Sequence, residues 1–446
     1  MPFAAALFAS ATPLSGQSAT DAVQQVSGDL PDGGGSYRLA KPDRWNGVLI
    51  LDLDFAARPD APLYKRLHAL GYAGAGTTRG QAGERGTAVD NQGRIARQLE
   101  ALRLFTDKFG KPRRVISFGF SGAGGLALAL LEAAPEHIDG SVAACIVTGS
   151  IAWFNSKLDA AFAAKTLIAP DNAALLLQNM PRDLTATARA WNDMLTAAQA
   201  TPQGRARIAL ATALGQLPTW SSSTSPAPDP ADLAGVQRAM FDTLASQFGA
   251  VLGGHVRVRR DFEESAGGPL SWNVGISYRG LFADADTTQR ETIRKLYRAA
   301  GLDLDADLRR LDAAPRVSAD PAAVRRADQL LGVTAKPRRP VLLFHTSGDW
   351  LAPPATLEAY TRRAPKALVR RALVEAPGHC SFSIAENIAA IRTVDQRIVD
   401  GRWPDTSPAA MNARAKAADD SPARFIAFPL RRFERAFYTG DTPPTR

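Results

Sequence analysis

The sequence predicts a doubly wound α/β fold, a mostly parallel sheet that carries a large, mostly helical insertion. Short apolar segments alternate with amphipathic helices over residues 46–148, and the same alternation returns over residues 339–399. Between these two regions the pattern is helical, with no comparable alternation. Apolar strands separated by amphipathic helices are typical of a parallel sheet covered on both faces, and its crossovers are right-handed.

Each element of the first region follows from its residue pattern. Continuous apolar runs predict buried strands, and three- or four-residue spacing of apolar side chains predicts helices. Ile95, Leu99, Leu102 and Phe105 show that helical spacing before a Gly-Lys-Pro stop at residues 110–112. The expected strands are 46–55, 72–78, 115–118 and 141–148, and the expected helices are 61–70, 92–109 and 126–131.

The second region repeats the pattern. Strands are expected at 340–346 and 367–374, each followed by a helix, at 355–363 and 382–399. At about 150 residues per domain, a chain of 446 residues holds two or three units. We therefore expect an α/β core of residues 36–150 and 339–446, a helical cap of residues 151–338 inserted before the later strands, and an N-terminal segment of residues 1–35.

The N-terminal segment has features of a signal peptide. It is apolar, and Ala9-Ser10-Ala11 matches an Ala-x-Ala cleavage site, but the usual Lys or Arg at the start is absent. A secreted or periplasmic protein and a cytoplasmic one therefore both remain open. No apolar run approaches the ~20 residues that span a bilayer, so no membrane span is expected.

Composition argues against several classes of partner. The net charge of +9 comes largely from Arg residues scattered among acids, and no nucleic-acid module is recognisable. No His/Cys/Asp cluster has metal-ligand spacing, so neither a metal nor an organic cofactor is expected. The two cysteines, Cys145 and Cys380, read as two buried thiols. The oligomeric state is left open.

The segment Gly119-Phe-Ser-Gly-Ala123 joins the third strand to its helix. A sharp strand-to-helix turn places its apex residue, Ser121, in a strained conformation and exposes the hydroxyl. Small residues two positions either side are then required, and Gly119 and Ala123 meet that requirement. A phosphate loop is the alternative for a Gly-rich turn, but both the G-x-G-x-x-G spacing and the Gly-Lys-Ser/Thr ending are missing.

This turn resembles the nucleophile elbow of the α/β-hydrolase superfamily, with Ala123 in place of the commoner Gly. In that fold the order along the chain is Ser, acid, His. Asp349 follows the first strand after the insertion, and His379 follows the last strand. The resemblance therefore implies a triad in which Ser121 attacks, His379 transfers the proton and Asp349 orients His379.

The resemblance also implies an oxyanion hole. One donor is the N–H after the nucleophile, here Gly122, and the other lies in the loop after the first strand of the core, here Phe55 or its neighbour Ala56. Many relatives carry His-Gly where this chain has Asp54-Phe55. We expect the Asp54 carboxylate to point away from the hole, held by a basic or N–H partner such as Arg79. The alternative is that Asp54 contacts the substrate.

His379-Cys380 is also similar to a segment of tannases and feruloyl esterases, in which a second Cys precedes the nucleophile. Phe120 stands at that position here, so neither a disulfide nor that substrate class is assigned. Aromatic side chains of the insertion are expected mostly to form its own core, with a subset lining an apolar pocket. The candidate substrate contacts are Phe120, Trp153, Trp272, Tyr278 and Trp350, together with Asp54.

The resulting functional hypothesis is a serine hydrolase that cleaves a small or medium-sized carboxylic ester through an acyl-enzyme. The alternative within enzymes is an amide or peptide hydrolase, since capped members of this fold include aminopeptidases. A non-catalytic binding protein on the same fold is the alternative from another class, because fold does not imply function.

Overall fold

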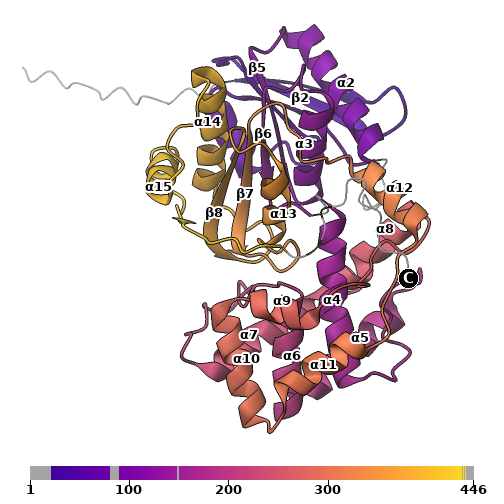
Figure 1. The fold of residues 1–446 in the computed structure, drawn as a ribbon. Helices are drawn as coiled ribbons and strands as arrows, with labels where there is room; N and C mark the ends of the chain where they lie inside the picture. Colours follow the sequence, from indigo (N-terminus) through magenta and orange to yellow (C-terminus); the bar gives the residue numbers. More distant parts are fainter. Residues whose placement is uncertain (1–21, 81–89, 148–149, 434, 436, 438–446) are drawn as a thin grey trace, which may run out of the picture.

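Within the residues that the computed structural model describes (22–80, 90–147, 150–433, 435 and 437), a nine-stranded sheet forms one part of the molecule. A layer of helices forms the other part, below the carboxyl ends of the strands in Figure 1. Helix α4 (Ile151–Ile168) leaves the sheet and runs through this layer.

The sheet has the order β1-β2-β4-β3-β5-β6-β7-β8-β9. Its six central strands are parallel, whereas β1 and β2 at one edge and β9 at the other pair antiparallel. The strands are β1 (Val23–Asp29), β2 (Ser36–Pro42), β3 (Val48–Asp52), β4 (Ala73–Thr77), β5 (Arg114–Phe120), β6 (Gly140–Ala144), β7 (Val341–Gly348), β8 (Val369–Pro377) and β9 (Phe425–Ile426). The predicted mostly parallel sheet is therefore confirmed.

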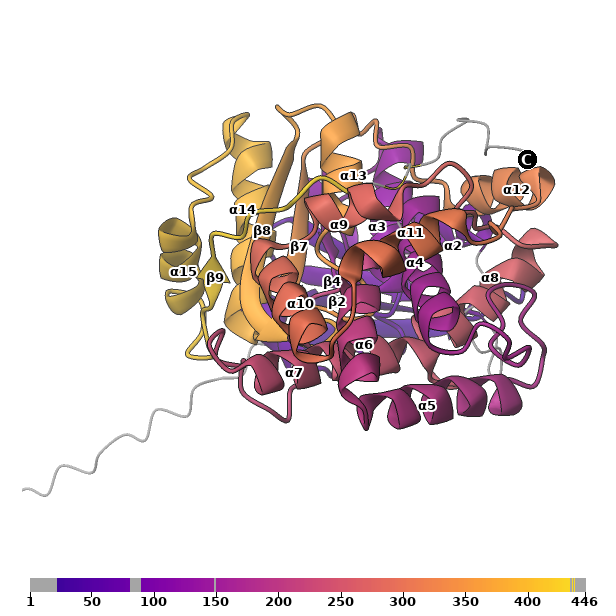
Figure 2. The same ribbon diagram turned by 60° about the horizontal axis from the view of Figure 1, so that its bottom comes forward.

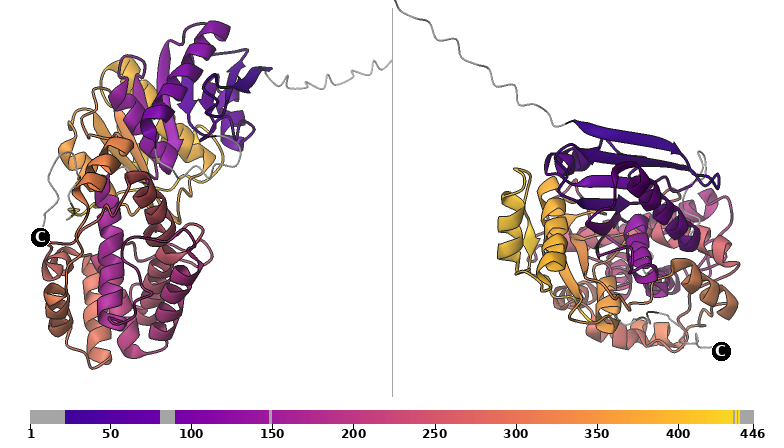
Figure 3. Two further views of the ribbon diagram at one scale, coloured as in Figure 1. Left: turned by 90° about the vertical axis from the view of Figure 1, so that its right-hand side faces the viewer. Right: turned by 90° about the horizontal axis from the view of Figure 1, so that it is seen from above.

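Helices cover both faces of this sheet, as the view from above in Figure 3 shows. One face packs against α1 (Pro62–Ala69), α14 (Ile384–Asp400) and α15 (Pro408–Lys416). The other packs against α2 (Asn91–Phe109), α3 (Gly122–Ala133) and α13 (Thr356–Arg363). The fully buried central strands explain why their sequences read as continuous apolar runs instead of alternating ones.

The chain between β6 and β7 is helical (Figure 2). Its buried apolar side chains form a core of their own. A second apolar cluster, which includes Trp153, Phe262 and Leu351, joins this layer to the sheet. After α4 come α5 (Thr185–Gln199), α6 (Pro202–Leu214), α7 (Leu233–Ala245), η1 (Ser246–Phe248), η2 (Gly254–Val258), α8 (Arg259–Ala266), α9 (Tyr278–Asp284), α10 (Thr287–Ala299), α11 (Leu304–Ala313) and α12 (Pro321–Leu331).

Two boundaries differ from the sequence prediction. Strand β1 lies inside the segment 1–35 that was set apart from the core, and its pairing with β2 extends the sheet. The strand expected to reach residue 148 ends at Ala144, because Cys145 adopts a positive φ of 43°. The proposed cleavage site at residues 9–11 lies outside the described residues. No described helix is both long and apolar enough to cross a membrane.

Candidate active site

Ser121 occupies the apex between β5 and α3. Its φ of 60° is in the left-handed region, which costs a non-glycine residue roughly 1–3 kcal/mol. A side chain at Gly119 would collide with the backbone carbonyl of Ala123, and one at Gly124 with the carbonyl of Ala144. These close approaches explain the run of small residues in the sequence.

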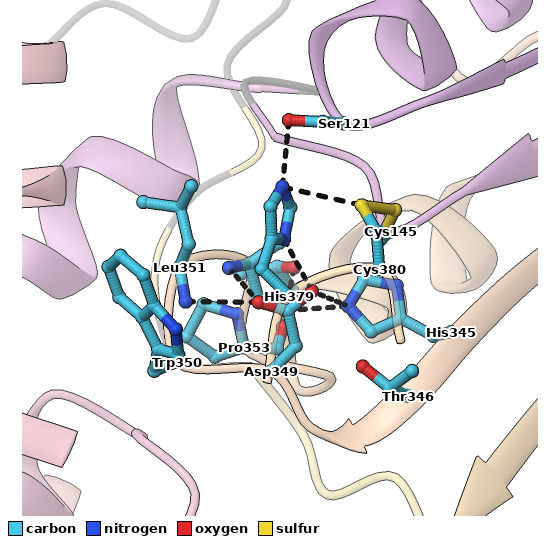
Figure 4. Close-up of polar contacts among 12 residues, drawn as sticks. Ser121, Cys145, His345, Thr346, Asp349, Trp350, Leu351, Pro353, His379 and Cys380 are labelled. Carbon is cyan, nitrogen blue, oxygen red and sulfur yellow. Dashed lines mark hydrogen bonds and ion pairs between the residues drawn. A yellow bond between two sulfur atoms is a disulfide. The ribbon is translucent and has the colours of Figure 1, made fainter. Parts of the chain in front are cut away.

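The structure brings Ser121, His379 and Asp349 together in one hydrogen-bonded chain (Figure 4). The Nε2 atom of His379 lies 2.8 Å from the Ser121 hydroxyl oxygen, and Nδ1 lies 2.8 Å from Oδ2 of Asp349. The three residues come from the ends of β5, β7 and β8. Parallel strands place their carboxyl ends at one edge of the sheet, so residues far apart in sequence meet there.

Asp349 is held rigidly in this arrangement. Its Oδ1 accepts hydrogen bonds from the backbone N–H groups of Leu351, at 3.0 Å, and Ala352, at 2.8 Å. The second histidine nearby, His345, lies with Nε2 3.6 Å from Asp349, but that Nε2 also lies 2.6 Å from the Ala352 carbonyl. Burial lowers the pKa of His345, so its imidazole is neutral, and it is fully enclosed whereas His379 is partly exposed.

A disulfide joins Cys145 to Cys380, which corrects the prediction of two buried thiols. Cys145 directly follows β6, whose last residue accepts a hydrogen bond from the backbone N–H of Ser121. The Sγ atom of Cys380 lies 3.4 Å from Nε2 of His379. The partner of Cys380 thus follows β6, the strand next to the one that carries Ser121, and does not stand at position 120, as it does in the tannases and feruloyl esterases.

One of the two expected oxyanion donors is already engaged. The N–H of Phe55 donates to the Asp52 carbonyl at 3.2 Å, and its ring is fully buried. This turn leaves Phe55 unable to serve as the donor predicted from the sequence. The N–H of Gly122 is the first of helix α3, and such groups have no acceptor within their own helix.

The Asp54 carboxylate is bound by two arginines, as the sequence analysis predicted for Arg79. Nε and Nη2 of Arg79 lie 2.7 Å from Oδ1 and Oδ2 of Asp54, and Nη2 of Arg58 lies 2.9 Å from Oδ2. Burial alone would raise the pKa of Asp54, but Arg79 and then Arg58 outweigh it and hold that pKa below its ordinary value.

The neighbouring Asp52 behaves differently. Burial and the adjacent charge of Asp54 raise the pKa of Asp52 to about 6. Its two oxygens accept hydrogen bonds from the Asp54 N–H and the Tyr64 hydroxyl. Through these hydrogen bonds Asp52 stabilises the turn that carries Asp54.

Most of the aromatic candidates are packed inside the protein. Trp153 and Trp272 belong to the cluster between sheet and helices, and Tyr278 is fully buried with its hydroxyl bonded to Asn273 and Asp159. Phe120 is partly buried against Phe118 and Phe382. The remaining candidate, Trp350, is also only partly buried.

Lys157 lies beneath the loop that carries Asp349. Its Nζ donates to the Trp350 carbonyl at 3.0 Å and sits 5.3 Å from the ring of Trp153. Burial lowers the pKa of this fully enclosed lysine to about 7, although the charge of Asp349 opposes the shift. The sequence analysis did not single out this residue, which lies on helix α4 among mostly apolar side chains.

Among the described residues, Cys145, His379 and Cys380 form a group close enough to share a metal ion. Their chemistry does not suit one, because sulfurs joined in a disulfide are not thiolates and the histidine faces Ser121. The group instead places a covalent link beside the imidazole.

Comparison with known proteins gives one close relative and several distant structures. No protein-family model matches the chain. The o-phthalyl amidase of Xanthobacter agilis is 34% identical over 429 residues, which are 90% of this chain and 93% of the amidase. Feruloyl esterase B from Aspergillus oryzae is 12% identical, with a TM-score of 0.39 over 86% of this chain and 81% of that one. The rice cell wall degrading esterase LipA from Xanthomonas oryzae is 13% identical, with a TM-score of 0.36 over 85% and 88%.

Proposed function

Because this chain belongs to the α/β-hydrolase family of the Xanthobacter agilis o-phthalyl amidase, we propose that it is a serine hydrolase that cleaves a carboxylic amide through an acyl-enzyme. The observation that carries the proposal is the hydrogen-bonded chain from Ser121 through His379 to Asp349 at the elbow. Amide cleavage comes first because the relative, similar over nearly its whole length, is an amidase.

In the proposed mechanism, Ser121 attacks the substrate carbonyl while Nε2 of His379 accepts the hydroxyl proton. Asp349 keeps Nδ1 protonated and stabilises the imidazolium that forms. His379 then returns the proton to the departing amine nitrogen, which leaves an acyl group on Ser121. Water attacks this acyl-enzyme by the same route, and the carboxylic acid is released.

The negative charge on the tetrahedral intermediate needs two donors. We assign these to the N–H of Gly122 and the N–H of Ala56, in place of Phe55. No described backbone carbonyl accepts from Ala56, and Gly122 is at the positive end of helix α3. The helical insertion, proposed as a cap domain of residues 151–338, would cover this site and restrict the substrate.

Ester hydrolysis, which the sequence analysis placed first, is the second candidate. The same serine and histidine serve both reactions, and an alkoxide departs from the tetrahedral intermediate more readily than an amine does. We therefore expect activity on esters of the acid whose amides are cleaved.

The test compares wild-type protein with Ser121→Ala on a panel of p-nitrophenyl esters and aryl anilides. The proposal expects kcat on any cleaved substrate to fall by several orders of magnitude, about 10⁴-fold, in the variant. Asp349→Asn should also slow the reaction strongly, because His379 would lose its orienting partner. Hydrolysis that survives Ser121→Ala would refute the proposal, and a fluorophosphonate probe that fails to label the protein would favour a binding protein on this fold.

A further inference from the structure

Arg79 is anchored by one edge of its guanidinium, and its other edge has no hydrogen-bond partner among the described residues. An arginine has five N–H donors, and two of these are committed to Asp54 through Nε and Nη2. No described residue accepts a hydrogen bond from the other three, which are the two on Nη1 and the second on Nη2. This remaining edge, formed by Nη1 and Nη2, can bind a second carboxylate through two parallel hydrogen bonds.

That free edge lies beside the nucleophile. A Cβ atom built on Gly122 would stand 3.4 Å from Nη1 of Arg79, and Gly122 directly follows Ser121. The Arg79 side chain is 35% exposed, so a small molecule can reach it. The bidentate ion pair with Asp54 fixes the direction in which the edge points.

The local charge favours an anion. Asp54 forms ion pairs with both Arg79 and the more exposed Arg58, so one carboxylate faces two guanidinium groups. Arg94 lies close by on α2, and burial followed by the charge of Arg79 lowers the pKa of Arg94 to about 10. Asp52, with its pKa of about 6, is mostly ionised at neutral pH, so three arginines here face two carboxylates.

We propose that Arg79 binds a carboxylate on the acyl part of the substrate, so that the preferred substrates are half-amides or half-esters of dicarboxylic acids. The carboxylate is assigned to the acyl part of the substrate and not to the leaving group. The leaving group must face Nε2 of His379, whereas Arg79 lies beside Gly122. This inference rests on the proposed function, because it takes Ser121 as the nucleophile.

The experiment uses a matched substrate pair, the 4-nitroanilide of phthalic acid with its second carboxyl free and the same anilide with that carboxyl methylated. Rates without enzyme are subtracted, because the neighbouring carboxylate can assist cleavage. Wild-type protein should prefer the free acid by roughly 10- to 100-fold in kcat/KM, the value of a charge-assisted pair of hydrogen bonds. Arg79→Met should lose that preference through slower cleavage of the free acid.

Arg58→Met is the matched control. It removes the other arginine bound to Asp54 but leaves the edge beside Gly122 intact, so the preference for the free acid should remain. Because Arg79→Met leaves the buried Asp54 with a single partner, the double variant Asp54→Asn/Arg79→Met is included. It removes both charges together and should also show no preference for the free acid over the methylated substrate.

The outcomes separate this inference from the proposed function. A wild-type enzyme that does not favour the free acid, or Arg79 variants that lose both substrates equally, would overturn the carboxylate site while fluorophosphonate labelling of Ser121 still upholds the hydrolase. Absence of labelling, together with activity that survives Ser121→Ala, would instead overturn the proposed function itself.

Discussion

Cys145 and Cys380 form a disulfide that ties the histidine loop to the strand beside the nucleophile. The two cysteines are separated by 235 positions in the sequence. One follows β6, which contacts Ser121, and the other follows His379. The disulfide therefore joins the loop that carries His379 to the end of β6, the strand that is hydrogen-bonded to the backbone of Ser121.

Replacing both cysteines, as Cys145→Ala/Cys380→Ala, should lower the free energy of unfolding by about 2–4 kcal/mol. It should also reduce kcat more than it changes KM, because His379 would be less firmly placed against Ser121. Denaturant titration and steady-state kinetics measure the two effects. Reduced wild-type protein serves as the control and should resemble the variant. Two reactive thiols in unreduced, denatured wild type would show that the bond is absent.

Asp54→Asn should destabilise the protein at neutral pH, by roughly 1–3 kcal/mol, because two arginines lose a charged acceptor. The pKa of Asp54 is held below its ordinary value of 3.8, so its contribution is present above that value and is lost as pH falls through the lower, folded-state value. The difference between wild type and variant should consequently shrink in acid. Unfolding titrations at pH 7, 5 and 3 test this, and a constant difference would contradict the ion-pair assignment.

Lys157→Met should flatten the pH dependence of stability in the alkaline range. The folded-state pKa of Lys157 is about 7, against 10.5 ordinarily, so the unfolded chain binds more protons between these values. Stability then rises with pH across this window by up to ~1.4 kcal/mol per pH unit. Unfolding titrations of both proteins at several pH values between 7 and 10 measure the slope. Parallel curves for the two proteins would mean that Lys157 is not buried as a neutral amine.

Gly119→Ala should strongly destabilise the elbow, since its Cβ would meet the backbone carbonyl of Ala123, which cannot move without disturbing α3. We expect a loss of about 1–3 kcal/mol in the free energy of unfolding, with lower activity. Gly110→Ala is the control, because a Cβ there meets nothing within 4 Å, although its positive φ carries a smaller cost. Equal effects from the two substitutions would argue against the steric explanation.

The mostly parallel sheet and the meeting of Ser121, Asp349 and His379 could be predicted from sequence because each depends on local patterns. Continuous apolar runs mark the buried strands, and Ser121, Asp349 and His379 each follow one of them. Their meeting needs only the rule that parallel strands end at one edge. The prediction that Arg79 holds Asp54 succeeded for a similar reason, since both residues follow neighbouring strands, β3 and β4.

What escaped prediction depends on contacts that sequence patterns do not encode. The disulfide depends on how the end of β6 lies against the loop after β8, which no local pattern shows. The resemblance to other enzymes pointed to position 120 instead, where this chain has Phe120. The N–H of Phe55 is used by a tight turn whose geometry is visible only in the fold. Strand β1 was overlooked because its alternating, half-polar pattern lies next to a signal-like segment.

The most direct test of this account is to locate the residue that becomes covalently modified. Protein inactivated with a fluorophosphonate is digested, and the peptides are analysed by mass spectrometry. We predict a single adduct on the peptide containing Ser121, formed in step with the loss of hydrolysis and absent from Ser121→Ala. Loss of activity with the adduct on another residue, or an adduct on Ser121 with hydrolysis intact, would contradict the assignment of Ser121 as the nucleophile.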